Sequence, residues 1–161
     1  MRKLPITKGH FTIVDDDDFE RVCIFRWCYY GDGYAARGYR ENGKVRIVRL
    51  HHMIIGNPRP GFLVDHINGN RLDNRKSNLR FVTNQQNIFN SQKRQLIISG
   101  GNSSKYKGVT WMTDRNKWRN RITLGGREFH LGVFESEQEA ALAYNQAAIK
   151  FYGEYSKLNQ L

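Results

Sequence analysis

The residues best suited to chemistry lie in a short stretch near the middle of the chain. Asp65 and His66 are adjacent at the end of an apolar run, and Asn87 follows further along. A carboxylate and an amide oxygen are ligands that a hard ion such as Mg²⁺ accepts, with phosphate oxygens and waters filling its other positions. A neutral imidazole can take a proton from an attacking water near pH 7. The set therefore suits hydrolysis of a phosphodiester bond, with His66 as the base and Asp65 and Asn87 as metal ligands.

The elements that must position these side chains form a small module. The expected order is a strand at 63–67, a turn at 68–70, a strand at 79–82 and a helix from 84 to about 94. Adjacent strand residues point to opposite faces, so Asp65 and His66 can flank one phosphate only if the chain bends or twists there. Because so small a module buries little, we expect the amides of Asn74 and Asn78 to tie the loop to the backbone.

Several runs in this region follow one another at compatible spacing. They are Leu50-His51-His52, Val64-Asp65-His66-Ile67-Asn68-Gly69-Asn70, Leu72-Asp73-Asn74-Arg75, Asn78-Leu79-Arg80 and Thr83 through Asn87. Together, over about residues 45–94, they resemble the HNH endonucleases of bacteriophage and intron type, some of which are mobile homing enzymes. The resemblance implies a ββα-metal fold with His66 as general base and with Asp65 and Asn87 on the metal. It further implies that Asn78 pins the loop and that His51 contacts the phosphate.

The metal expected at this site is a hard ion. The motif ends in Asn87 rather than in the His of many relatives, and an amide is a poor ligand for soft metals, so Mg²⁺ or Mn²⁺ is expected rather than Zn²⁺. Arg75 and Arg80 of the same runs are expected to contact DNA. Two other metal sites are conceivable: zinc held by Cys23, Cys28, His51 and His52, and a cation held by Asp15–Asp18. The spacing of the cysteines and the divergence of consecutive acidic side chains argue against both.

The net positive charge of the chain indicates what class of molecule it binds. A net charge of +11 on 161 residues favours a polyanion, with nucleic acid ahead of a membrane because no basic amphipathic helix stands out. No apolar run approaches the roughly 20 residues that a membrane span needs, and the first residues lack the apolar stretch of a secretory signal. A cytoplasmic location is expected, or the host cytoplasm and nucleoid if a phage encodes the protein.

The chain is expected to be an α+β protein with two modules. A nuclease domain at 1–97 precedes a linker of glycine and small polar residues at 98–104, and a second domain occupies 105–161. Within the first domain, a strand and an acidic helix are expected over 11–27, and a β-hairpin with several arginines over 29–50. These arginines, Arg37, Arg40, Arg46 and Arg49, with Lys44, are either phosphate contacts or a solvated strand edge.

The second domain is expected to be a three-stranded sheet covered by one helix. Its strands are predicted at 106–111, 117–124 and 127–134, and its helix at 137–152, opened by Ser136 and ended by Gly153. In the middle strand, alternation places Trp118, Ile122 and Leu124 on one face. Arg119, Arg121 and Thr123 fall on the other, so one face is apolar and the other basic.

Further runs give this domain a family resemblance. They are Ser104-Lys-Tyr-Lys-Gly-Val109, Lys117-Trp118, Leu131-Gly-Val-Phe134, Glu139-Ala-Ala-Leu-Ala-Tyr144, Ala147-Ala148 and Leu158-Asn159. They resemble the Apetala-two, or ethylene-response-factor, DNA-binding domain, which lays its sheet in the major groove. The resemblance implies that DNA is faced by Lys107, Thr110, Arg119, Arg121, Thr123 and His130. Because the family's usual residues are replaced at several of these positions, the target sequence is not inherited, and Arg119 and Arg121 are either guanine or phosphate contacts.

The sequence as a whole predicts an HNH endonuclease that is targeted to double-stranded DNA by its C-terminal domain. One active site per chain cuts one strand, so a monomer or weak dimer that nicks is expected, without a membrane partner. The main alternative is a DNA-binding regulator that carries an inactive nuclease remnant. An RNA-binding or structural accessory protein is a third class, disfavoured because the sheet lacks exposed aromatic pairs that would stack on bases.

Overall fold

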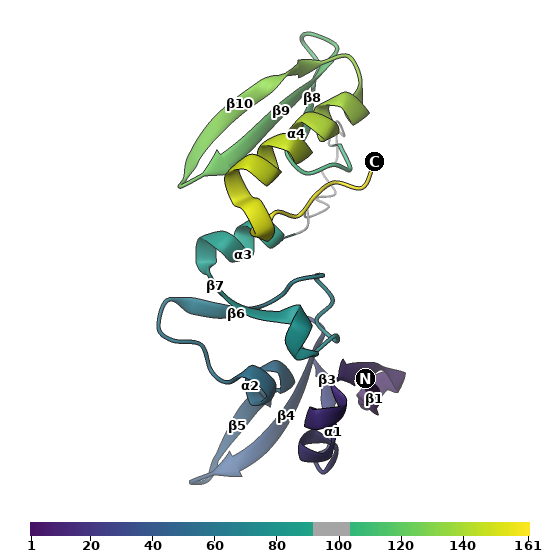
Figure 1. The fold of residues 1–161 in the computed structure, drawn as a ribbon, viewed down its shortest axis with the longest axis vertical. Coiled ribbons are helices and arrows are strands. Elements are labelled where there is room, and N and C mark those ends of the chain that lie inside the picture. The colour runs from purple at the N-terminus through teal and green to yellow at the C-terminus, as the bar shows by residue number, and fades with distance from the viewer. Residues whose placement is uncertain (92–103) are drawn as a thin grey trace. The chain divides into compact units, whose positions relative to one another are not determined.

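The computed structural model describes residues 1–91 and 104–161, and Figure 1 shows their course. They form two compact units, Met1–Asn84 and Gln85–Leu161, here called the first and the second unit and each described by itself. Apart from Ser104, the predicted linker at 98–104 lies outside the described residues. The mixed α+β class is confirmed, with a strand–strand–helix run followed by a three-stranded antiparallel sheet that packs on one helix.

The first unit contains three small antiparallel sheets, β1–β2, β3–β4–β5 and β6–β7. Its strands are β1 (Arg2–Pro5), β2 (Phe11–Val14), β3 (Cys28–Tyr30), β4 (Tyr34–Glu41), β5 (Lys44–Arg49), β6 (Phe62–His66) and β7 (Leu79–Thr83). Its helices are α1 (Asp16–Cys23) and α2 (Leu50–Ile55), with short 3₁₀ turns at Thr7–Gly9 and Lys76–Asn78. The core gathers apolar side chains from the N-terminal segment, α1, α2 and β7 around the buried ring of Trp27.

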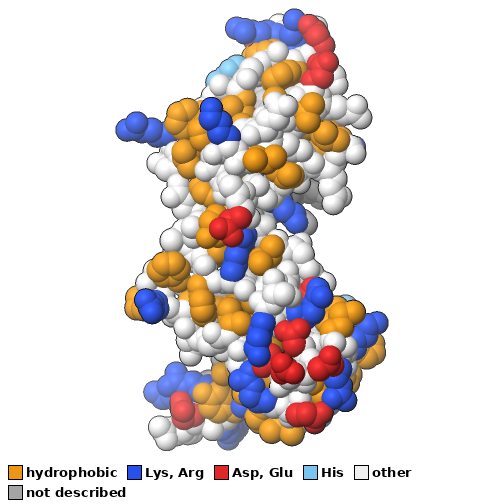
Figure 2. Space-filling model, in the orientation of Figure 1, with side chains coloured by type: hydrophobic (Ala, Val, Ile, Leu, Met, Phe, Trp, Pro, Cys, Tyr) orange, Lys and Arg blue, Asp and Glu red, His pale blue; other side chains and the backbone are white. Residues whose placement is uncertain are grey.

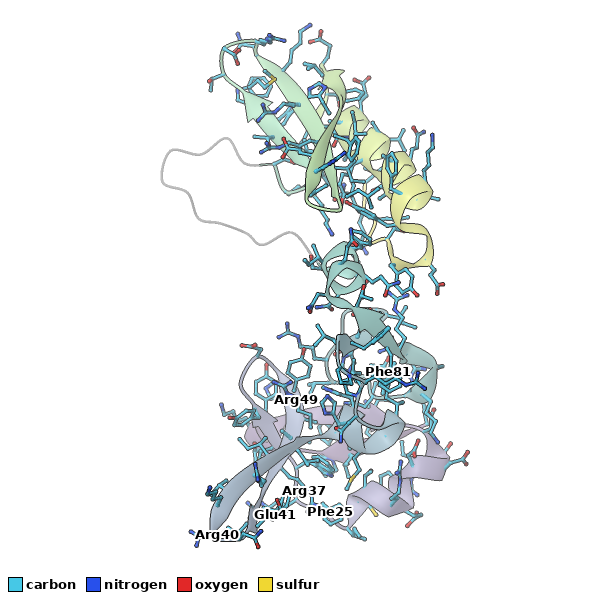
Figure 3. The ribbon with its side chains drawn as sticks, turned by 90° about the vertical axis from the view of Figure 1, so that its left-hand side faces the viewer. Phe25, Arg37, Arg40, Glu41, Arg49 and Phe81 are labelled. Atoms are coloured by element: carbon cyan, nitrogen blue, oxygen red, sulfur yellow. The ribbon has the colours of Figure 1, made fainter. Side chains whose placement is uncertain are left out.

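The predicted hairpin is formed by β4 and β5. Glu41 and Lys44 are cross-strand partners, and Asn42 and Gly43 between them both have positive φ angles, 50° and 75°, as a tight two-residue hairpin turn requires. The Arg37 guanidinium lies 3.7 Å from the centre of the Phe25 ring instead of projecting into solvent, and Figure 3 labels both residues. The hairpin is therefore confirmed, although one of its arginines packs back onto the unit.

The second unit contains a sheet of order β10–β9–β8 with a helix on one face. The elements are α3 (Asn84–Asn90), β8 (Val109–Met112), β9 (Lys117–Leu124), β10 (Arg127–Phe134), α4 (Glu137–Tyr152) and a 3₁₀ turn at Gly153–Tyr155. Ser136 caps α4 by accepting hydrogen bonds from the backbone N–H of Gln138 and Glu139, at 3.2 and 3.5 Å. Figure 1 shows α4 lying across the sheet, which buries the small residues of its inner face.

Two of the element boundaries that differ from the prediction lie near the start and the end of the undescribed segment. The first strand of the sheet begins at Val109 rather than at residue 106, because Gly108 has a φ of +79°, which breaks the extended conformation. Helix α3 ends at Asn90, before residue 94, and Ser91 closes it with a hydrogen bond from its hydroxyl to the Ile88 carbonyl, at 2.6 Å. This helix belongs to the second unit, whereas the sequence grouped it with the first.

Candidate active site and DNA-binding face

Strand β6 brings a buried carboxylate and a buried imidazole to its end. Asp65 is 7% exposed and His66 is 4% exposed. The Arg80 side chain of β7, directly across the ribbon from Asp65, donates from Nε to Asp65 Oδ2 at 3.0 Å. An ion pair compensates the cost of burying this charge. Arg80, predicted as a DNA contact, is therefore occupied as the partner of Asp65.

The imidazole of His66 is held by a chain of hydrogen bonds from the N-terminal segment. Asn74 Oδ1 lies 3.2 Å from His66 Nε2, and Asn74 Nδ2 donates to Thr12 Oγ1 at 2.7 Å. The Thr12 hydroxyl in turn donates to the Leu72 carbonyl at 2.8 Å. Because the amide nitrogen of Asn74 faces Thr12, its oxygen faces His66. The neutral ring then carries its hydrogen on Nε2 and keeps its lone pair on Nδ1.

The backbone of β2 holds the same loop. Ile13 N donates to the Leu72 carbonyl and Asn74 N donates to the Ile13 carbonyl, each at 2.8 Å. No motif in the sequence links this distant strand to the site, and Thr12 is a supporting residue that the sequence predictions do not include. The sequence shows only a threonine within a short expected strand, and threonine is common in strands.

Two aromatic rings, those of His51 and Tyr34, lie beside the His66 ring. The ring centre of His51, on α2, lies 5.2 Å from that of His66, and the Tyr34 ring lies 5.2 Å from His51 and 6.0 Å from His66. Burial lowers the pKa of His66 below 6.5, against the opposing effects of the Asn74 hydrogen bond and of the Asp65 and Asp73 charges. Burial, with the positive charges of its neighbours, lowers the pKa of His51 to about 3. Both rings are therefore neutral near pH 7.

Basic side chains border this group of rings. The guanidinium groups of Arg49 and Arg71 lie 4.9 and 4.8 Å from the centre of the Tyr34 ring. Arg71 also donates to the Asp32 carbonyl, and Arg49 is labelled in Figure 3 at the end of β5. Two exposed cations beside a buried neutral imidazole form a setting that attracts a phosphate. The sequence predictions included Arg49 and omitted both Tyr34 and Arg71.

The loop between β6 and β7 is tied by Asn78. Its Oδ1 accepts from the Asn68 backbone N–H at 3.0 Å, and its Nδ2 donates to the Asp73 carbonyl at 2.8 Å and to Asn68 Oδ1 at 3.1 Å. Asp73 receives two hydrogen bonds from Arg75, at 2.7 and 2.6 Å. These hydrogen bonds from Arg75, against the effect of burial, lower the pKa of Asp73. Arg75, expected to contact DNA, is thus already engaged by a carboxylate.

The oxygen donors present suit a hard ion held largely by its substrate. Within residues 1–91 and 104–161, no group of three or more His, Cys, Asp and Glu side chains gathers as a soft metal would require. Mg²⁺ commonly takes one or two protein oxygens together with phosphates and waters. Asp65 of the first unit carries one oxygen of this kind, and Asn87, half-buried on α3 of the second unit, carries another. Each side chain, taken by itself, has the donor chemistry that Mg²⁺ or Mn²⁺ accepts.

Two residues of the acidic run Asp15–Asp18, Asp16 and Asp18, form ion pairs. Asp16 pairs with the N-terminal amine at 2.6 Å, and Asp18 pairs with Arg21 at 2.6 Å and with Lys76 at 2.9 Å. Figure 2 shows acidic and basic side chains intermixed over part of the lower surface. Asp15 accepts from the Lys76 backbone N–H instead of joining the others. The acidic side chains thus stabilise the fold locally.

The second unit presents one polar sheet face away from α4. In β9, Asn120 and Ile122 are buried beneath the helix, whereas Thr123 is exposed. The predicted division of β9 into two faces is therefore confirmed, with Asn120, which donates to the Ala140 carbonyl, as an unforeseen polar member of the buried face. Cross-strand register places five of the predicted DNA-facing residues on the outer face: Thr110 opposite Arg119, His130 opposite Arg121, and Thr123 opposite Glu128.

Two of the predicted DNA-facing residues on this unit, Arg121 and Lys107, already have partners within it. The Arg121 guanidinium donates to Glu128 at 2.9 Å. Lys107, expected to face DNA, instead directs its ammonium group to backbone carbonyls of Ile88, Phe89 and Ser91, at 3.2, 2.8 and 2.8 Å. An ammonium group has three hydrogens, and each has an acceptor. The ammonium group of Lys107 is thus engaged within the unit, and its contact with DNA stays a prediction.

Comparisons with known proteins match both halves of the chain. Residues 53–88 match the HNH endonuclease family. An uncharacterized HNH endonuclease of Acanthamoeba polyphaga mimivirus is 30% identical over 156 residues, which cover 96% of this chain and 77% of that protein. An AP2-like ethylene-responsive transcription factor of Arabidopsis thaliana is 38% identical over 77 residues, and one of Oryza sativa is 35% identical over the same length. Each match covers 47% of this chain.

The plant matches concern one domain only. They cover 13% of the Arabidopsis protein and 12% of the rice protein, so this chain spans a small part of those factors. No solved structure matches the chain. In the described parts of the chain, no helix is both long and apolar enough to cross a membrane. The AP2-like similarity supports a DNA-binding domain in the C-terminal half.

Proposed function

The chain belongs to the HNH endonuclease family, and from this premise we propose that it is a metal-dependent endonuclease that nicks double-stranded DNA held by its AP2-like domain. The observation that carries the proposal is the buried, neutral His66, fixed by Asn74 and flanked by Asp65. A core histidine without a catalytic role needs neither a buried carboxylate next to it in the strand nor two arginines, Arg49 and Arg71, at the neighbouring Tyr34 ring. We further propose a mobile, homing-type setting, which rests on the resemblance of the motifs to HNH enzymes of bacteriophage and intron type.

In the proposed reaction, His66 acts as general base. Its Nδ1 accepts a proton from a water that attacks the scissile phosphorus. The bond from phosphorus to the leaving oxygen breaks, the electron pair stays on that oxygen, and the oxygen takes a proton from solvent water to leave as the free hydroxyl end of the cut strand. The Nε2–H bond to Asn74 keeps the ring in the required tautomer and orientation. His51, buried and neutral, is the candidate for a hydrogen bond to the phosphate. Asn78 keeps the loop after β6 closed and thereby positions His66 indirectly.

Asp65 and Asn87 would hold Mg²⁺ or Mn²⁺. The ion, when bound, would neutralise the charge that develops on the phosphate and polarise it toward attack. Arg80, which pairs with Asp65 Oδ2, would compete with the ion for this oxygen. Asp65 and Arg80 thus form a charge-balanced pair that binding of a metal and a phosphate would have to open, with the phosphate as a new partner for the guanidinium.

The sheet of the second unit would bind the duplex through its outer face. Arg119, Arg121 and His130 supply hydrogen-bond donors there, and Thr110 and Thr123 add short side chains that allow close approach. A sheet face that holds duplex DNA raises the effective concentration of substrate at the nuclease module of the same chain. One such module per chain predicts nicks, and one chain or a weak dimer suffices for them.

The alternative function is a DNA-binding regulator with an inactive nuclease remnant. The observation that favours it is the pairing of Arg80 with Asp65 and of Arg75 with Asp73, which stabilises this region independently of catalysis. The test is incubation of supercoiled plasmid with the protein across Mg²⁺, Mn²⁺ and chelator. Conversion to open circles that requires the ion supports the nuclease, and unchanged plasmid in every ion supports the regulator.

A further inference from the structure

Helix α3 cannot be stable by itself. It has seven residues, Asn84–Asn90, and helices this short are unstable in water without tertiary contacts. The carbonyls of its last turn have no partner within the helix and carry the negative end of its dipole. No basic residue stands in that turn. The helix therefore needs donors from elsewhere in the second unit.

Two of these carbonyls also accept from neutral donors, Ile88 from Ser91 and Phe89 from the Lys157 N–H at 3.3 Å. Lys107 adds a cationic donor from a distant point in the sequence. Its ammonium group reaches the carbonyls of Ile88, Phe89 and Ser91, all within 3.2 Å. Burial lowers the pKa of Lys107 to about 8, and the positive charge of Lys157 acts in the same direction, so the group remains mostly protonated at pH 7. A cation at the end of a helix is both a hydrogen-bond donor and a partner for the dipole.

Lys107 is itself fixed by the fold of the second unit. Its backbone N–H donates to Asn159 Oδ1 at 2.7 Å, and its carbonyl accepts from Asn159 Nδ2 at 3.1 Å. Asn159 is held in turn by two hydrogen bonds with Asn145 of α4, at 2.9 and 2.7 Å. A second contact joins α3 to α4, because the Phe89 ring stacks on Tyr152 with centres 3.8 Å apart. The AP2-like fold thus contacts the C-terminal end of α3 through the Lys107 hydrogen bonds and the Phe89–Tyr152 ring stack.

We propose that Lys107 is a positioning residue of the nuclease, which fixes the helix that carries Asn87 and so makes metal binding depend on the AP2-like fold. The proposal rests on the proposed function, in which Asn87 is a metal ligand. Asn87 immediately precedes Ile88, whose carbonyl Lys107 holds. The C-terminal domain is then a structural part of the HNH motif as well as a DNA-binding domain.

The test compares Lys107→Met with Lys150→Met in the full chain. Lys150 is an exposed lysine of α4 and matches the loss of charge. Hydrogen exchange is measured at amides of α3 and of β9, and Mn²⁺ affinity is measured by electron paramagnetic resonance. We expect Lys107→Met to raise α3 exchange at least about tenfold and to weaken Mn²⁺ binding similarly, because hydrogen bonds of a charged group are lost. Exchange in β9 stays unchanged, and Lys107→Arg, which keeps a cationic donor, restores most of both losses.

The outcomes separate this proposal from the proposed function. Unchanged α3 exchange and Mn²⁺ affinity in Lys107→Met would overturn the positioning role, even if the wild type cleaves DNA. A wild type that binds no Mn²⁺ and cuts no DNA would overturn the proposed function, while α3 exchange still reports whether Lys107 holds the helix. If Lys107→Met also loses protection from exchange in β9, the Lys107→Arg variant decides the question. Should Lys107→Arg protect the amides of β9 and leave those of α3 unprotected, the proposal is contradicted.

Discussion

Replacement of Gly108 by alanine tests how tightly the AP2-like sheet packs on its helix. A Cβ at Gly108 would lie 2.5 Å from Tyr144 Cε2 and 2.7 Å from the Arg121 carbonyl oxygen, both far inside contact distance. The residue also has a φ of +79°, which costs a side chain about 1–2 kcal/mol. The forced contact adds about 1–3 kcal/mol because Tyr144 is buried and cannot move aside freely. Gly108→Ala is therefore expected to destabilise the second unit by about 2–5 kcal/mol.

Gly126→Ala is the matched control. Gly126 has nearly the same φ, +77°, but nothing lies within 4 Å of the position of its Cβ. It should cost only the backbone term of about 1–2 kcal/mol. The assay is a urea titration followed by nuclear magnetic resonance of Trp118, a residue of the second unit, so that unfolding of the first unit does not interfere. Equal destabilisation by the two substitutions would refute the packing argument, since they differ only in the contact.

Three further predictions concern charge, acid stability and the loop. Glu128→Gln should raise the affinity for duplex DNA and steepen its salt dependence, because it removes an anion that pairs with Arg121 on the DNA-facing sheet. Fluorescence anisotropy at several salt concentrations measures both quantities. Unchanged binding would contradict the assignment of this face to DNA. The pKa of Asp73 is lowered in the folded protein, so its pairing with Arg75 stabilises the first unit at pH values above the unfolded pKa of about 3.9. This stabilisation is lost as the pH falls through the lower folded pKa. Asp73→Asn should therefore reduce the loss of thermal stability between pH 5 and 2, and an unaltered pH profile would count against the pairing. Asn78→Ala leaves buried loop groups without partners and should cost about 1–3 kcal/mol in urea unfolding of the first unit, with slower nicking; full stability would show that Asn78 does not hold the loop.

Alternation in the sequence predicted the parts of the fold that depend on local pattern. Ile122 is buried and Thr123 is exposed, as a period of two requires, and Ser136 and Gly153 mark the ends of α4 as expected. The hairpin turn at Asn42-Gly43 was also predictable, because its positive φ angles favour Asn and Gly at these two positions. These features depend on neighbours within a few positions.

The features that could not be predicted depend on distant partners. Thr12 lies far before Asn74 in the sequence, yet a hydrogen bond joins them and orients His66 through Asn74. In the sequence, Lys107 is indistinguishable from other basic residues of a DNA-binding domain. The structure shows that its ammonium group donates to the Phe89 carbonyl of α3. Composition gives no means of telling a lysine that binds phosphate from one that caps a helix, because both need the same charge.

The most direct test of the nuclease assignment is single-turnover cleavage of a labelled duplex by wild type and His66→Ala, with duplex binding measured on the same samples. His10→Ala, an exposed histidine outside the site, is the matched control. Loss of a general base predicts a fall in cleavage rate of about 10²–10⁴-fold, with binding unchanged and with His10→Ala at the wild-type rate. Cleavage by His66→Ala as fast as by the wild type, or no ion-dependent cleavage by any of the three, would contradict the assignment.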